Sequence, residues 1–148
     1  MEFSHILVLC TGNICRSPMA SALLQDQLHA SGKPDLEITS AGIAAVAGHA
    51  ASDTAQQLMQ ERGLDISGHR ATQLIPQMLL QTDLVLVMEK EQQRAVERMQ
   101  PAATGRVFRL GHWGDYDIPD PFRQETGVYR EVLGMIDEGV VDWMERIG

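Results

Sequence analysis

Lysine is scarce in this sequence, and positive charge is in deficit overall. Lys33 and Lys90 are the only lysines, and 20 acidic residues stand against 12 basic ones, which gives a formal net charge of −8. Nucleic acids and anionic membrane surfaces bind proteins through dense basic patches, so this balance argues against both as partners. An anionic substrate would need a local, shaped site instead of a broad positive field.

Long hydrophobic stretches and cysteines are scarce as well. No apolar run approaches the ~20 residues of a membrane-spanning helix, so no membrane insertion is expected. The first residues, "MEFSHILVLC", carry Glu2 and lack the basic flank of a signal peptide. Cys10 and Cys15 are too few to form the disulfide framework of a secreted protein. We therefore expect a cytoplasmic protein.

Strand-like and helix-like patterns alternate along the 148 residues. Unbroken Ile, Leu and Val runs indicate buried strands, and apolar residues at helical spacing indicate the helices between them. The expected strands are 3–9, 36–40, 83–88 and 106–110, and the expected helices are 18–30, 52–62, 70–80, 89–99 and 129–147. This order predicts a single α/β domain, residues 1–148, with a four-stranded parallel sheet and helices on both faces. Functional residues should lie at the carboxyl ends of the strands.

The segment after the first expected strand, "CTGNICRS", has the composition of a phosphate-binding loop. Gly12 and Asn13 tolerate backbone conformations that other residues resist. Such a loop points its N–H groups at an anion, and Arg16 adds a planar fork suited to paired phosphate oxygens. This surrounding positive charge favours the thiolate form of Cys10. The predicted nucleophile is Cys10, and the predicted lining residues are Thr11, Gly12, Asn13, Ile14, Cys15 and Ser17.

Other interpretations of this loop fit less well. The cysteines could be small buried hydrophobes, but Arg16 and Ser17 would then stand at a helix start with no nearby carboxylate to pair them. A Cys-x4-Cys spacing is not typical of zinc sites, and the five histidines are scattered, so no metal is expected. The one Gly-Lys pair, residues 32–33, lacks the flanking residues of a nucleotide-binding loop.

Cleavage of a phosphate ester by a thiolate needs a proton donor for the leaving oxygen, which is typically worth about 10²–10⁴-fold in rate. Asp115, Asp117 and Asp120 lie in the long loop before the last helix. Asp120 stands between two prolines, and this stiff, extended backbone would hold a catalytic carboxyl well. We predict that Asp120 is the general acid, and that Asp115 and Asp117 belong to a solvated acidic loop.

The stretch "CTGNICRSP" resembles the phosphate loop of the low-molecular-weight protein tyrosine phosphatases, with their C-x5-R-S/T pattern. "SAG", "GHRA", "VLVMEKE" and "DPF" extend the resemblance over the whole chain. "FRLGHWGDYDIPDPFR" is most similar to the bacterial branch found beside exopolysaccharide-export tyrosine kinases. The resemblance implies a phosphatase domain over residues 1–148, a phosphocysteine intermediate and no cofactor.

The resemblance also implies roles for individual residues. Asp120 matches the family's general acid, and Phe122 matches an aromatic wall of the substrate slot. Ser40 and His69 match a serine and a histidine that support the strained asparagine, here Asn13.

Further features of the family bear on the loop and the cleft. Cys15 matches a cysteine that can pair with the nucleophile, Cys10, in a reversible disulfide. The aromatic that many members place opposite the Asp-Pro aromatic is missing, so Ile43 or Val46 is expected to form a shallower wall. Thr11 follows the nucleophile, and threonine at this position is associated with phosphoarginine phosphatases.

The leading interpretation is a hydrolase of phosphotyrosine in proteins that acts on a tyrosine kinase of polysaccharide export. A phosphoarginine-protein phosphatase on the same scaffold is the first alternative. A thiol-based arsenate reductase would need cysteines beyond Cys15. A cysteine phosphocarrier is disfavoured because Arg16 and Asp120 would promote hydrolysis of its phosphocysteine. A phosphoprotein-binding module would bind without turnover.

Overall fold

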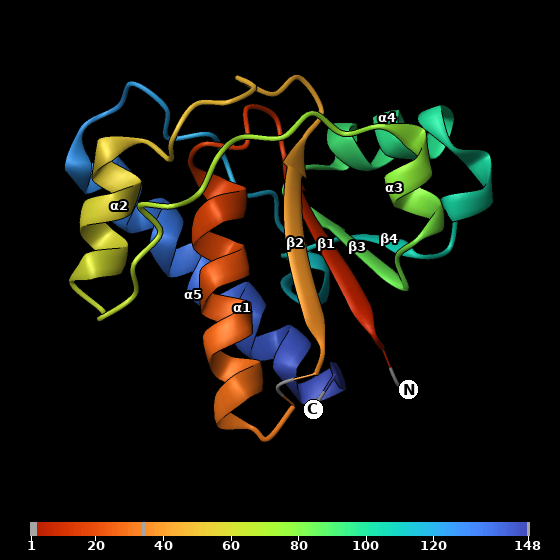
Figure 1. Cartoon of the computed structure of the whole chain (residues 1–148), viewed down its shortest axis with the longest axis horizontal. Coiled ribbons are helices and arrows are strands. Elements are labelled where there is room, and N and C mark those ends of the chain that lie inside the picture. Colours follow the sequence, from red (N-terminus) through yellow and green to blue (C-terminus); the bar gives the residue numbers. More distant parts are fainter. Residues whose placement is uncertain (1–2, 34, 148) are drawn as a thin grey trace.

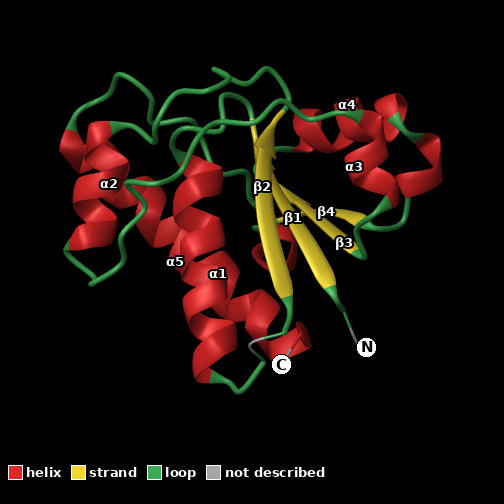
Figure 2. Cartoon of the chain, viewed as in Figure 1, coloured by secondary structure: helices red, strands yellow, loops and turns green. Residues whose placement is uncertain are grey.

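Four parallel strands form the centre of the molecule, in the order β2-β1-β3-β4 (Figure 2). The computed structural model describes residues 3–33 and 35–147. The strands are β1 (His5–Cys10), β2 (Glu37–Gly42), β3 (Leu84–Val87) and β4 (Val107–Arg109). β1 pairs with β2 and β3, and β3 pairs with β4, all in parallel. The predicted α/β fold with a four-stranded parallel sheet is confirmed.

Helices cover both faces of this sheet, as Figure 1 shows. One face carries the three helices α1 (Arg16–Ala30), α2 (Asp53–Gln60) and α5 (Thr126–Ile147). The other face carries the shorter α3 (Pro76–Leu80) and α4 (Lys90–Met99). The short 3-10 helices η1 (Pro101–Ala103) and η2 (His112–Gly114) flank β4.

The two hydrophobic clusters of the core follow from the alternation of side chains along the strands. In β1, Ile6 and Val8 belong to the cluster that contains the buried residues of α1, α2 and α5. Leu7 and Leu9 belong to the cluster that contains Leu79 of α3 and residues of α4. Because each central strand is buried on both faces, it is an unbroken apolar run in the sequence.

The helix expected over residues 70–80 forms only in its second half, as α3, so the prediction is wrong for residues 70–75. Pro76 begins α3, because a proline without an N–H is tolerated at the first helical position and not in a helix interior. The residues before it run along the end of β2 instead. Gly42 N–H donates to the Thr72 carbonyl, and Leu74 N–H donates to the Gly42 carbonyl. This extended segment brings polar groups to the carboxyl end of the sheet.

In the ranges 3–33 and 35–147, none of the helices combines the length and the apolarity needed to cross a bilayer. Helix α5 has 22 residues, but it is amphipathic, and its buried side chains face the sheet and α1.

Candidate active site

The loop between β1 and α1 surrounds the sulfur of Cys10. The residue is 2% exposed. Its Sγ accepts a hydrogen bond from Asn13 N–H at 3.2 Å and lies 3.0 Å from Ser17 Oγ. Helix α1 begins at Arg16, so the positive end of its dipole lies beside the same loop. These groups stabilise negative charge on the sulfur, as predicted for an anion-binding loop.

Asn13 holds the loop in shape from its centre. It adopts φ 59°, a left-handed conformation that costs free energy for most residues. Its Nδ2 donates to Ser17 Oγ at 2.7 Å and to Ser40 Oγ at 3.1 Å. Its Oδ1 accepts from Thr72 N–H at 2.9 Å, and its carbonyl oxygen lies 2.7 Å from His69 Nε2. The structure therefore places both predicted support residues, Ser40 and His69, against Asn13.

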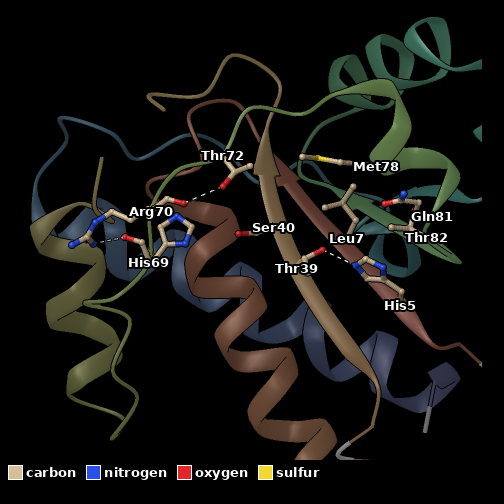
Figure 3. A pocket seen from close by; sticks show the side chains of 10 residues that line it. All are labelled: His5, Leu7, Thr39, Ser40, His69, Arg70, Thr72, Met78, Gln81 and Thr82. Atoms are coloured by element: carbon tan, nitrogen blue, oxygen red, sulfur yellow. Dashed lines mark hydrogen bonds between the residues drawn. The ribbon is translucent and has the colours of Figure 1, made fainter. Parts of the chain in front are cut away.

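Figure 3 shows where these supports come from. Ser40 lies on β2, whereas His69 and Thr72 belong to the extended segment before α3. All three also line a cavity of about 460 Å³, together with residues of β1, β2 and α3. Thr72 was not predicted from the sequence. It contacts Asn13 through its backbone N–H, so its residue type gives no sign of this contact.

Asn13→Ala should lower the free energy of unfolding by about 2–4 kcal/mol, because it leaves buried polar groups unpaired and puts an alanine in a left-handed conformation. Asn13→Gly loses the same hydrogen bonds without the steric cost, so it should be less destabilising by about 1 kcal/mol. Denaturant unfolding of the two variants measures this difference. Equal losses for alanine and glycine would contradict a strained native backbone.

Arg16 lies behind the loop with a side chain only 1% exposed. Its Nη1 donates to Glu89 Oε2 at 2.6 Å and to the Ile118 carbonyl at 2.8 Å. The other edge of the guanidinium, formed by Nε and Nη2, has no close partner among the described residues. Within the described residues, the buried Nε has no hydrogen-bond partner, and Nη2 makes only long contacts, 3.5 Å to Thr11 Oγ1 and 3.8 Å to Asp120 Oδ2. That edge has donors in the fork geometry that binds two oxygens of a phosphate.

Glu89 was also not predicted from the sequence, and the premise that Arg16 has no nearby carboxylate is wrong. The two residues are 73 positions apart in the chain. Glu89 directly follows Met88 at the end of β3, and β3 lies beside β1 in the sheet. A carboxylate directly after a buried parallel strand is the signal that points to this edge of the sheet.

Asp120 and Phe122 lie at the mouth of the site. The Asp120 side chain is 47% exposed, and its Oδ1 accepts from Phe122 N–H at 3.0 Å. Phe122 is 41% exposed, and the Arg123 guanidinium lies 5.2 Å from its ring centre. A cleft of about 190 Å³ is lined by Cys10, Thr11, Gly12, Ile14, Cys15, Arg16, Ala44, Val46, Asp120 and Phe122. The structure thus brings the distant Asp120 to the loop of Cys10.

The wall opposite Phe122 comes from the segment after β2. Ala44 and Val46 line the cleft, and their N–H groups donate to the carbonyls of Thr11 and Gly12. Ile43 does not line it but packs against the core cluster on the α3 and α4 face. Of the two residues expected for this wall, Val46 lines the cleft and Ile43 does not.

Asp115 and Asp117 have exposed side chains, as predicted for a solvated acidic loop, but both also have structural partners. Both accept from the buried Arg109 of β4, at 2.5 Å to Asp115 and 3.0 Å to Asp117. The hydrogen bond from Arg109 holds the pKa of Asp115 below its usual value. Asp117 also accepts from Lys90 N–H at the start of α4. These pairs fix the loop that carries Asp120 to the edge of the sheet.

Cys15 faces away from the solvent into a small polar cluster. Its Sγ donates to Ser52 Oγ at 3.6 Å and lies 3.3 Å from Tyr129 Oη, which itself donates to Ser52. Burial raises the pKa of the Cys15 thiol, and burial also raises the pKa of Tyr129 to about 12. Both groups are therefore protonated at neutral pH. The two cysteines are free here, so their disulfide stays a prediction.

In the described parts of the chain, no three side chains of His, Cys, Asp or Glu come together as metal ligands would.

Known proteins are similar to this chain in sequence and in architecture. The family model described as "Low molecular weight phosphotyrosine protein phosphatase" matches residues 5–148. A "Probable low molecular weight protein-tyrosine-phosphatase EpsP" of Ralstonia nicotianae is 46% identical over 142 residues, 96% of this chain and 94% of that protein.

Solved structures agree in fold over almost the whole length. The tyrosine phosphatase Wzb from Escherichia coli K30, solved with sulphate, has a TM-score of 0.91 and 37% identity, with 99% of each chain covered. The YwlE arginine phosphatase from Geobacillus stearothermophilus has a TM-score of 0.87 and 34% identity, with 97% of this chain and 92% of that chain covered. By its sequence and its fold, this chain belongs to the low molecular weight phosphotyrosine protein phosphatase family.

Proposed function

We propose that this chain hydrolyses phosphotyrosine in proteins with Cys10 as nucleophile, Arg16 as oxyanion clamp and Asp120 as general acid. The observation that carries the proposal is the Arg16 guanidinium, whose Nε–Nη2 edge is available to an oxyanion in the cleft that also contains the Cys10 sulfur. Glu89 and the Ile118 carbonyl hold the opposite side of the guanidinium, so the clamp is oriented before substrate binds.

The first step would form a bond from the Cys10 sulfur to phosphorus and break the bond from phosphorus to the tyrosine oxygen. Asp120, protonated, would donate its proton to that oxygen as it leaves. In the second step the Asp120 carboxylate would take a proton from a water molecule that attacks phosphorus. The sulfur–phosphorus bond then breaks, and phosphate is released. The loop N–H groups and Arg16 stabilise the charge on the phosphoryl oxygens in both steps.

The walls of the cleft fit an aromatic leaving group. Ile14, Val46 and Phe122 present apolar surface around its opening, and Phe122 can stack on a phenyl ring. Asp120 lines the same cleft, as its proposed role of proton donor to the leaving oxygen requires.

We propose further that the phosphoprotein is a tyrosine kinase of polysaccharide export in the cytoplasm. Support comes from the stretch 108–123, which resembles the bacterial branch found beside such kinases. A thiolate nucleophile also requires a reducing compartment to stay active. We infer in addition that residues 1–148 act as one phosphatase domain, since the family model spans 5–148.

The function is tested with the purified chain and a panel of phosphopeptides in the presence of EDTA. Phosphate should be released from the phosphotyrosine peptide, far more slowly from a phosphoserine peptide, and at the same rate without the chelator. Rapid acid quenching should trap phosphate on Cys10. Absence of turnover on phosphotyrosine, or activity that EDTA removes, would contradict the proposal.

A phosphoarginine-protein phosphatase is the second candidate. Thr11 follows the nucleophile, and the Geobacillus protein of the same fold is named an arginine phosphatase. A phosphoarginine peptide in the same panel compares the two substrates directly through kcat/KM.

A further inference from the structure

Four side chains form a closed ring of hydrogen bonds at one side of the cleft. Arg16 Nη1 donates to Glu89 Oε2 at 2.6 Å, and Gln92 Nε2 contacts the same oxygen at 3.4 Å. Gln92 Nε2 also donates to Thr11 Oγ1 at 3.0 Å, and Arg16 Nη2 lies 3.5 Å from that hydroxyl oxygen. The ring therefore joins the phosphate clamp to the first residue after the nucleophile. The mechanism proposed above uses Arg16 and Glu89 from this ring and gives no role to Gln92 or to the Thr11 hydroxyl.

The orientation of the Gln92 amide is determined by its other contacts. Its Oε1 accepts from the N–H groups of Met88 and Glu89, at 2.9 and 3.0 Å. Backbone N–H groups only donate, so the oxygen must face them and the NH₂ group must face Thr11. Gln92 is 6% exposed, and the same contacts complete the capping box of α4. The donor that reaches Thr11 is thus held in place by the fold.

This arrangement decides the direction of the Thr11 hydroxyl proton. A hydroxyl has one donor and two acceptor positions. The Gln92 amide and the Arg16 guanidinium both present N–H groups to the oxygen, so the O–H bond must point away from both. Thr11 is exposed and lines the cleft, so its proton is free to point toward a substrate bound there.

We propose that Gln92 is a specificity-positioning residue, which makes the Thr11 hydroxyl a donor toward the substrate and selects phosphate esters of oxygen over phosphoramidates. The oxygen that joins phosphorus to a tyrosine ring only accepts hydrogen bonds. In phosphoarginine the corresponding atom is a nitrogen that bears a hydrogen, next to further guanidinium N–H groups. A donating hydroxyl complements the first group and opposes the second. The inference rests on the proposed function, and it assigns Thr11 in this chain to phosphotyrosine.

The test measures kcat/KM on a phosphotyrosine peptide and a phosphoarginine peptide of the same sequence. Gln92→Glu retains an oxygen for the two backbone N–H groups but presents an acceptor to Thr11, whose proton then turns away from the cleft. The ratio of the two kcat/KM values should fall by about tenfold, as for the loss of one hydrogen bond. Thr11→Val, which leaves α4 untouched, should lower the ratio similarly, whereas Thr11→Ser should keep it.

The double variant Gln92→Glu/Thr11→Val separates positioning from a general structural effect. Its ratio should equal that of Thr11→Val alone, because Gln92 acts through the hydroxyl. Gln93→Glu adds the same charge one residue along the helix and should leave the ratio unchanged.

Three results would overturn the inference. They are equal losses on both substrates in Gln92→Glu, an unchanged ratio in Thr11→Val, and a wild type that prefers phosphoarginine. The proposed function would survive the first two of these as long as turnover depends on Cys10, whereas a preference for phosphoarginine would favour the second candidate function. A wild type inactive on both peptides would refute the proposed function itself.

Discussion

Replacing Cys10 by serine is expected to abolish turnover of a phosphotyrosine peptide, with kcat lowered by more than about 10⁴-fold. A serine hydroxyl is a weak nucleophile at neutral pH unless a base takes its proton. The partner of the Cys10 sulfur here is Ser17, a hydroxyl, at 3.0 Å, and no carboxylate or histidine hydrogen-bonds to that sulfur within the described residues. Steady-state phosphate release measures the effect.

Cys15→Ser is the matched control for loss of a thiol. Cys15 contributes its side chain to the cluster with Ser52 and Tyr129, and a hydroxyl can replace the thiol in those hydrogen bonds. Turnover should therefore stay within about tenfold of wild type, since removal of a buried hydrogen-bonding group here costs of order 1 kcal/mol. Cys10→Ser should still bind a phosphotyrosine peptide, because Arg16 and the loop N–H groups remain. Comparable activity in Cys10→Ser and Cys15→Ser would rule out Cys10 as the nucleophile.

Asp120→Asn should lower kcat/KM for a phosphotyrosine peptide by about 10²–10⁴-fold, because the amide cannot give a proton to the leaving oxygen. The parameter kcat/KM reports the steps up to formation of phosphocysteine, so it isolates this proton transfer from the later hydrolysis. p-Nitrophenyl phosphate has a leaving group that needs little protonation. The loss on that substrate should be clearly smaller.

Asp117→Asn is the control for a carboxylate of the same loop. Asp117 pairs with Arg109 and Lys90 N–H and does not line the cleft. Its replacement should change kcat/KM by only a few-fold, through the position of the loop. If the two variants lose the same activity, or if the Asp120→Asn loss is independent of the leaving group, Asp120 is not the general acid.

The phosphate loop was the part of the site that could best be predicted from the sequence, since its residues are neighbours in the chain. Residues 11–15 form the loop between β1 and α1, and Asn13 adopts the left-handed conformation that its residue type suggested. Asp120 was accessible for a similar reason, because two flanking prolines restrict its own backbone. Neither argument required knowledge of which segments meet in space.

The contacts across the sheet were harder to predict from the sequence. Glu89, Gln92 and Thr72 reach the loop from segments 59–81 residues away. Their positions depend on the strand order β2-β1-β3-β4, which puts the ends of β2 and β3 on either side of β1. The helix expected over 70–80 failed for the same reason, because pairing with Gly42 competes with the local helical pattern.

The sequence by itself therefore determined the fold class and the conformation of the phosphate loop, because apolar periodicity, glycine and proline act on the backbone nearby. It also revealed the family, through the resemblance of "CTGNICRSP" and the stretches that extend it. Only the tertiary structure decided how Arg16 is oriented and which side chains contact the Thr11 hydroxyl. Glu89 accepts a hydrogen bond from Arg16, and Gln92 donates one to Thr11. Parallel pairing of β1 and β3 brings both residues beside the loop. Such directional contacts between distant segments leave no periodic pattern in the chain, since they require only one residue of the right type at one position.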